Sequence, residues 1–176
     1  MIKESPKAIS YYNFKFHIGL EKYLYTVDNI RHRIALSRFR LSNHNLLIET
    51  GRHQRPKLER YERKCFICEN KIEDETHFLV ECPLYFSERK LLYDTVLENS
   101  QQYISIESSI DKCTFLLINE DQNVMKKVAK YIFYSMQISV KHINDISNCF
   151  KTNVILNDLA LTTATTPLHS LETNCI

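Results

Sequence analysis

Three cysteines and one histidine near the middle of the chain have the spacing of a metal site. They follow the pattern Cys65-x2-Cys68-x8-His77-x4-Cys82. Zinc binds four thiolate or imidazole ligands in a closed tetrahedral structural site. A Cys-x2-Cys pair turns the backbone so that both sulfurs converge, and a polar loop over 69–76 returns the second pair. In a reducing compartment thiols stay available to metal, so the pattern predicts Zn²⁺ at these four residues. The alternative is three free core cysteines and a histidine that is hydrogen-bonded within a helix.

A basic segment precedes this pattern. From Arg31 to Lys64, ten Lys and Arg residues oppose three acids, which gives this segment a net charge of +7. The whole chain carries only +2, so the rest carries −5. A basic block in a mildly acidic chain predicts contact with the phosphates of RNA or DNA; the alternative is a solvated helix face. The candidate nucleic-acid-binding residues are Arg31, Arg33, Arg38, Arg40, Arg52, Arg55, Lys57, Arg60, Arg63 and Lys64.

Composition narrows the fold and the compartment. Two glycines in 176 residues argue against a hairpin-rich β fold and against a Gly-rich phosphate loop. No apolar run approaches the roughly 20 residues of a membrane span, and the first residues show no apolar signal core. We therefore expect an intracellular protein, in the nucleus or the cytoplasm, without a disulfide framework. Cys113, Cys149 and Cys175 have no neighbours at ligand spacing, so we interpret them as structural or incidental thiols.

The apolar periodicity predicts a mainly α fold with a small Cys2HisCys zinc knuckle embedded between helices. The expected order is an irregular lead-in over 1–15, a basic helical segment over 16–64, the zinc knuckle and a following helix over 65–100, a helical pair over 106–143, and a disordered tail over 144–176.

The same periodicity predicts which helix faces turn inward. Thr26 or Asp28 caps a helix that ends near Leu41 and buries a stripe of Ile30, Ile34 and Leu41. Asp74 or Glu75 begins a helix with His77 in its first turn, and Pro83 starts another. Ser108 or Ser109, and then 119–121, cap the last two helices. The expected buried residues of the later helices are Leu84, Leu91, Leu92, Val96, Val124, Val128, Tyr131, Ile132, Ser135 and Ile138.

Aromatic residues lie close to the basic segment. Phe39, Tyr61 and Phe66 have rings that can stack on bases. Core packing is the interpretation that we favour for all three.

The chain contains an ordered series of short motifs: Phe39-Arg40-Leu41-Ser42-Asn43-His44, Ile48-Glu49-x2-Arg52-His53, Glu62-Arg63-Lys64-Cys65-x2-Cys68 and Ile72-Glu73-Asp74-Glu75-x-His77-Phe78-Leu79-x2-Cys82-Pro83-Leu84-Tyr85. Over roughly residues 30–135, this series resembles the C-terminal region of reverse transcriptases of non-LTR (LINE-like) retrotransposons. The resemblance implies nucleic-acid binding that helps a polymerase engage element RNA or target DNA. It also implies that Cys65 and Cys68 of the third motif and His77 and Cys82 of the fourth ligate zinc.

Two departures limit this resemblance. The loop between Cys68 and His77 is longer than in the retroviral nucleocapsid knuckle, and no Tyr-x-Asp-Asp metal-binding turn of a polymerase is present. We therefore expect a detached or domesticated fragment that is not itself an enzyme, and one candidate partner is a polymerase domain encoded upstream. The leading hypothesis is a zinc-stabilised nucleic-acid-binding module.

Two other function classes remain open. In a zinc-stapled protein-interaction module, the docking surfaces would be the loop over 69–75, which is acidic, and the stripe from Val124 to Ile138. A hydrolytic or polymerising enzyme is the third class. A catalytic zinc keeps an open coordination position, whereas four protein ligands close the shell. A Cys–His nucleophile pair would lack oxyanion donors among the apolar neighbours of His77 and Cys82.

Overall fold

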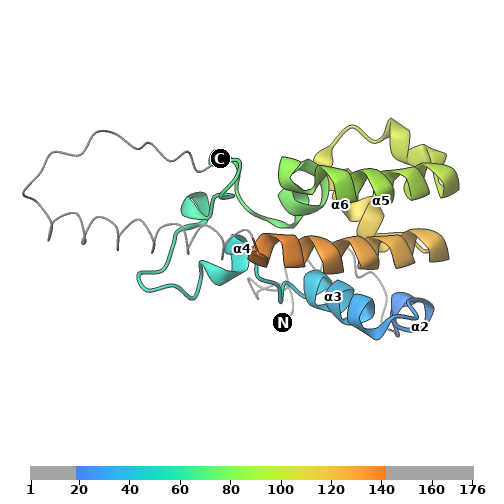
Figure 1. Cartoon of the computed structure of the whole chain (residues 1–176), viewed down its shortest axis with the longest axis horizontal. Coiled ribbons are helices and arrows are strands. Elements are labelled where there is room, and N and C mark those ends of the chain that lie inside the picture. Colours follow the sequence, from blue (N-terminus) through green and yellow to red (C-terminus); the bar gives the residue numbers. More distant parts are fainter. Residues whose placement is uncertain (1–18, 142–176) are drawn as a thin grey trace, which may run out of the picture. The chain divides into compact units, whose positions relative to one another are not determined.

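The structure, a computed structural model, describes residues 19–141 (Figure 1). The predicted lead-in over 1–15, the predicted tail over 144–176, Cys149 and Cys175 lie outside these residues. One compact unit ends at Met136, within the last helix. In chain order the elements are α2 (Tyr23–Thr26), α3 (Ile30–Arg40), α4 (Leu47–Thr50), the 3₁₀ turn η2 (Arg60–Glu62), the π-helix η3 (His77–Glu81), the 3₁₀ turn η4 (Pro83–Tyr85), α5 (Phe86–Asn99), the 3₁₀ turn η5 (Gln101–Ser105), α6 (Ser109–Ile118) and a helix over 122–141.

The mainly α prediction is confirmed for the described residues. Between residues 19 and 141 the only β pairing is one isolated antiparallel bridge between Lys64 and Ile72. Within the same range, no helix has the length and apolarity that a membrane span requires. Three helices, namely α3, α6 and the helix over 122–141, begin where a short polar side chain accepts hydrogen bonds from backbone amides that have no partner within the helix. The N-cap side chains of α2, α4 and α5 accept no such bond.

Three caps illustrate this rule. Asn29, one residue beyond the predicted cap, accepts from the amides of Arg31 and His32 at the start of α3. Ser108 caps α6 as predicted, and Asp121 accepts from the amide of Val124 at the start of the last helix.

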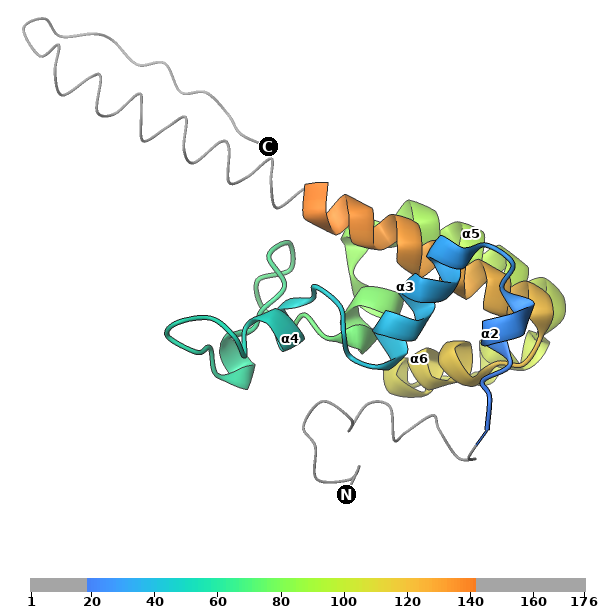
Figure 2. The same ribbon diagram turned by 90° about the horizontal axis from the view of Figure 1, so that it is seen from below.

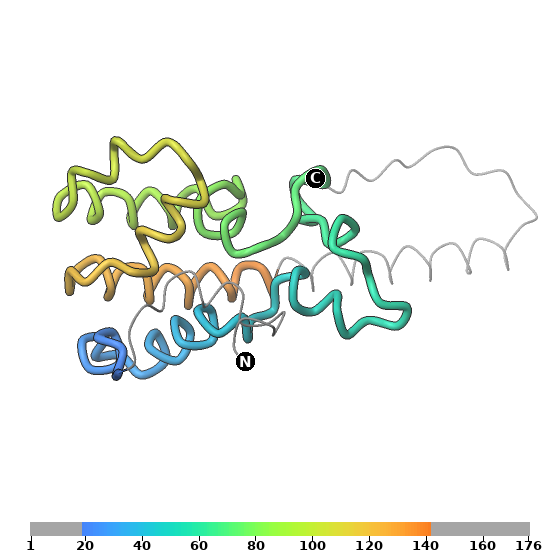
Figure 3. The backbone as a smooth tube through the Cα atoms, turned by 180° about the vertical axis from the view of Figure 1, so that it is seen from behind, coloured from blue at the N-terminus to red at the C-terminus, as the bar shows by residue number. Residues whose placement is uncertain are grey.

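α5 lies along the helix over 122–136, and α3 crosses the opposite side of that helix (Figures 1, 2 and 3). The segment from α4 to the start of η3 extends from one end of these helices (Figure 2). The core joins them through Phe78, which is fully buried in η3. Its ring lies 5.4 Å from Phe39 of α3, 4.7 Å from Tyr85 and 5.7 Å from Tyr131 of the last helix, measured between centroids.

The predicted inward face of the last helix is confirmed, because Val124, Val128, Tyr131, Ile132 and Ser135 are all buried. Ile138 is half-buried. For α5 the prediction is partly wrong.

In α5, Leu92 and Val96 are buried, but Leu91 is exposed and Leu84, before the helix, is half-buried. Leu91 and Leu92 are adjacent, and neighbours on a helix point about 100° apart.

The predicted buried stripe of α3 is wrong. Ile30, Ile34 and Leu41 are exposed, and the helix buries Leu36 and Phe39 on its other side. Both stripes have helical spacing, so periodicity alone does not choose between them. The contact of Phe39 with Phe78 determines which side faces the core.

Candidate metal centre

Cys65, Cys68, His77 and Cys82 converge on one site. Their ligand atoms all lie within 4.8 Å of one another, and this group of four can hold a metal ion. The sulfurs of Cys65 and Cys82 are 3.8 Å apart. Two sulfurs that each lie about 2.3 Å from a tetrahedral metal ion are about 3.8 Å apart. This pair therefore already has the spacing that a bound ion needs, and the widest pair must close by about 1 Å.

The first pair of ligands lies on a tight turn. The Glu69 amide donates to the Cys65 carbonyl at 2.8 Å, and Glu69 has a positive φ of 49°. The Cys65 amide donates to the Lys71 carbonyl at 2.7 Å, which closes the base of the loop. The turn thus directs both cysteine side chains to the same side.

The second pair lies on a single turn of π-helix. The Cys82 amide donates to the His77 carbonyl at 2.7 Å, the i→i+5 bond of this helix type. In an α-helix, residues five apart point to different faces, whereas the wider π turn brings them close to the same face. In this chain the π turn is therefore what brings His77 and Cys82 to the same side. The Asp74 carboxylate accepts from the His77 amide at 2.9 Å, which confirms the predicted start of this helix.

The thiols carry the electrostatic signature of a cation site. A hydrogen bond with Cys82 lowers the pKa of Cys65, and the backbone amides of Ile67 and Cys68 support the thiolate. The same hydrogen bond raises the pKa of Cys82, and burial raises that of Cys68. Without a cation, Cys68 and Cys82 retain their protons because a second negative charge beside the Cys65 thiolate would be repelled. A metal ion would replace those protons.

His77 is held in the orientation of a metal ligand. Its Nδ1 lies 3.4 Å from a Glu81 carboxylate oxygen, while its buried Nε2 has no hydrogen-bond partner. Burial lowers the pKa of His77, but Cys65 and Glu81 raise it more, so the net shift is upward. Metal-bound histidines commonly use one ring nitrogen on the ion and the other on a carboxylate. His77 fits this arrangement, with Nδ1 on the Glu81 carboxylate and Nε2 available to an ion.

Arg63 connects the metal-binding turn to α4. Its guanidinium donates to the Ile48 carbonyl at 3.0 Å and to the Leu58 carbonyl at 2.7 and 3.1 Å. Gly51 makes room for it, because a Cβ there would lie 2.9 Å from the Arg63 Cγ and 2.8 Å from the Leu47 carbonyl oxygen. Gly51 is the C-cap of α4 with a φ of −62°, so a left-handed conformation does not explain this glycine.

Arg89 fixes the other half of the site, and the sequence analysis missed it. This buried side chain of α5 donates to the carbonyls of Cys82 at 2.6 Å, Leu79 at 3.1 Å and Phe78 at 3.3 Å. These carbonyls belong to the end of the π-helix, where the Phe78 carbonyl also accepts from the Tyr131 hydroxyl at 2.9 Å and the Cys82 carbonyl from the Tyr85 amide at 3.3 Å. The spacing of Arg89 seven residues after a ligand cysteine was the only available signal. That spacing alone does not distinguish a clamp from a surface arginine.

The predicted nucleic-acid-binding residues separate by exposure. Arg33 and Arg52 are half-buried, and Arg52 pairs with Glu49 at 2.8 Å. Arg40 and Arg63 are buried, which is a correction, because their guanidinium groups serve internal contacts rather than a phosphate surface. The exposed members are Arg31, Arg38, Arg55, Lys57, Arg60 and Lys64.

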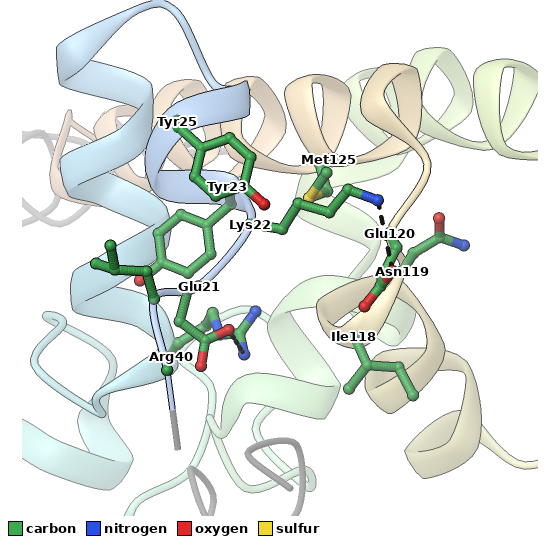
Figure 4. A pocket seen from close by; sticks show the side chains of 11 residues that line it. Glu21, Lys22, Tyr23, Tyr25, Arg40, Ile118, Asn119, Glu120 and Met125 are labelled. Carbon is green, nitrogen blue, oxygen red and sulfur yellow. Dashed lines mark hydrogen bonds and ion pairs between the residues drawn. The ribbon is translucent and has the colours of Figure 1, made fainter. Parts of the chain in front are cut away.

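Arg40 illustrates the correction. Its guanidinium donates to the Leu117 carbonyl at 2.8 Å and lies 3.0 Å from the Glu21 carboxylate. It also lies over the Tyr23 ring, 5.0 Å from the centroid. Figure 4 shows the Arg40–Glu21 ion pair in a pocket of about 390 Å³, where the Lys22–Glu120 ion pair also lies. Arg40 therefore joins α3 to the end of α6.

The three aromatic residues near the basic segment differ in burial. Phe39 is in the core as expected. Tyr61 is 69% exposed and Phe66 is 55% exposed, so the core interpretation is wrong for both. Phe66 lies in the Cys-x2-Cys turn, whose two ligands point inward and leave the intervening side chains outside.

Comparisons of the chain with models of protein families, with curated proteins and with solved structures find no match.

Proposed function

We propose that this chain is a zinc-stabilised nucleic-acid-binding module. Cys65, Cys68, His77 and Cys82 would hold the ion. Three soft sulfur donors and one imidazole suit zinc, and four protein ligands leave no open position for catalysis. The observation that carries the metal assignment is the 3.8 Å separation of the Cys65 and Cys82 sulfurs. Zinc would supply folding free energy to the segment between α4 and α5.

The exposed cations beside the metal-binding turn support the nucleic-acid assignment. Arg55, Lys57, Arg60 and Lys64 are all exposed within ten residues of Cys65. Arg60 also lies 3.7 Å from Asp74, but such an exposed pair is weak and leaves its charge open to a phosphate. Phosphate contacts of this kind give sequence-independent, salt-sensitive affinity.

The resemblance to the C-terminal region of LINE-like reverse transcriptases supports the same proposal. On this basis the chain would help a polymerase, encoded upstream, engage RNA or target DNA, and would not itself be an enzyme. A protein-interaction module is the competing function. Of the two docking surfaces expected for such a module, the stripe from Val124 to Ile138 is largely lost, because its residues from Val124 to Ser135 are buried.

Salt-dependent binding tests the proposal. Six exposed cations that each neutralise one phosphate of duplex DNA give a slope of log affinity against log salt of about −5. Replacing Arg55 and Lys57 with alanine should reduce the steepness by about 2, with similar losses for unrelated sequences.

The matched control removes the same charge elsewhere. Lys90 and Lys130 are exposed on α5 and on the last helix, outside the basic segment. Replacing both with alanine should leave the slope unchanged. Affinity that does not vary with salt would refute nucleic-acid binding through phosphates and favour a protein partner.

A further inference from the structure

The Cys-x2-Cys turn presents apolar side chains to solvent. Phe66 is 55% exposed and Ile67 is 37% exposed, although Cys65 beside them is buried. Because both flanking cysteines direct their sulfurs to the metal centre, the backbone between them is fixed in position. Phe66 is therefore an aromatic ring held on a rigid turn, so that a ligand would pay little entropy for ordering it.

Cations flank this ring. Lys64 is exposed two residues before Phe66. Lys71 is placed beside the turn from the other side of the loop, since its carbonyl accepts from the Cys65 amide at 2.7 Å. Lys71 lies 3.6 Å from Glu81, but its side chain remains 58% exposed. Glu69 is the opposing exposed acid on the turn, so the exposed charges of Lys64, Lys71 and Glu69 sum to +1, and the half-buried Glu81 offsets part of the Lys71 charge.

A second exposed ring precedes the turn. Tyr61 lies in η2 and is 69% exposed. The acids on either side of it, Glu59 and Glu62, form a capping box in which each carboxylate accepts from the other residue's backbone amide. The negative charge of both carboxylates is thereby partly neutralised by backbone N–H groups beside Tyr61.

We propose that Phe66 is a stacking platform for an unpaired base of single-stranded nucleic acid, with Lys64 and Lys71 on the neighbouring phosphates. The inference rests on the proposed function and specifies its substrate class. A single strand offers free base faces, whereas in a duplex each base is already stacked on its neighbours. An aromatic ring between two cations matches the alternation of base and phosphate along a single strand.

Three substitutions at Phe66 separate stacking from other roles. Phe66→Ala and Phe66→Leu should each lower the affinity for a dT oligonucleotide about 10-fold, because both remove the π face. Phe66→Tyr should retain affinity, and duplex affinity should change less than 2-fold in all three variants. An apolar contact without stacking predicts instead that Phe66→Leu retains affinity. Equal losses for single strand and duplex would also overturn the inference.

Fluorescence gives an independent readout, because the chain contains no tryptophan. Phe66→Trp places a sole tryptophan in the turn, and stacking on a base should quench its emission as the dT oligonucleotide binds. Tyr25→Trp is the matched control, since Tyr25 is 67% exposed in α2, outside the turn. Quenching at position 66 but not at position 25 is the expected result. Equal quenching, or none at position 66, would refute stacking.

The salt titration distinguishes this inference from the proposed function. Salt-sensitive binding that depends on Arg55 and Lys57 but is unaffected by Phe66→Ala would overturn the stacking site and leave the phosphate-binding module in place. Failure of the zinc-loaded wild-type chain to bind either a single strand or a duplex would refute both.

Discussion

Replacing Arg89 with methionine tests whether the clamp on the π-helix stabilises the metal centre. Methionine retains most of the apolar stem and removes the guanidinium. The carbonyl of Phe78 keeps the Tyr131 hydroxyl as a donor at 2.9 Å, so its loss is small. The contact with Leu79 at 3.1 Å is lost, and the Cys82 carbonyl loses its 2.6 Å contact but keeps the Tyr85 amide at 3.3 Å. Hydrogen bonds from a charged donor contribute about 1.5–3 kcal/mol each, and since the second is replaced in part, the expected loss in the free energy of unfolding is about 2–4 kcal/mol.

Urea unfolding of the zinc-loaded chain, followed by helical circular dichroism, measures this loss. With a slope of about 1–3 kcal/mol per molar urea, the midpoint should fall by about 1–3 M. Arg38→Met is the control, because Arg38 is exposed on α3, and it should change stability by less than about 0.5 kcal/mol. An Arg89→Met variant within about 1 kcal/mol of wild type, at an unchanged slope, would refute the clamp.

Three further predictions concern α4, the Cys-x2-Cys turn and α6. Gly51→Ala should lower the free energy of unfolding by about 1–3 kcal/mol, because the added Cβ overlaps the Arg63 side chain and the Leu47 carbonyl; an unchanged thermal midpoint would contradict this. Cys68→Ser, or chelation of zinc, should increase amide hydrogen exchange over 58–82 before it does so over 122–136, and simultaneous exchange in both ranges would show that the metal-binding turn is not a separate cooperative unit. Burial raises the pKa of Cys113 to about 12, so its thiol should stay protonated and resist iodoacetamide at pH 8 in the folded chain. The contribution of Cys113 to stability should fall as pH rises above 9, because the thiol of the unfolded chain ionises first. Rapid alkylation of Cys113 in the folded chain would refute its burial.

The sequence alone identifies the four candidate metal ligands, which the structure brings together, and the mainly α character of the described residues. Cys-x2-Cys is a local pattern, since a tight turn is enough to bring its two sulfurs together. Caps are local as well, which is why Ser108 was predicted correctly from the residues that follow it. The inward face of the last helix was also predictable, because its apolar residues from Val124 to Ile132 recur at helical spacing.

The tertiary structure determines which chemically similar residues serve which role. Arg40 and Arg38 differ little as sequence neighbours, but the carbonyl that Arg40 reaches is 77 residues away, and no local pattern encodes that contact. α3 has two stripes of helical spacing, and the aromatic ring of Phe78 selects the one that contains Phe39. Phe66 was assigned to the core on hydrophobicity alone, yet it is exposed because both neighbouring cysteines must point inward. Burial depends on what the rest of the chain brings to each side of a helix or turn, which hydrophobicity and periodicity do not specify.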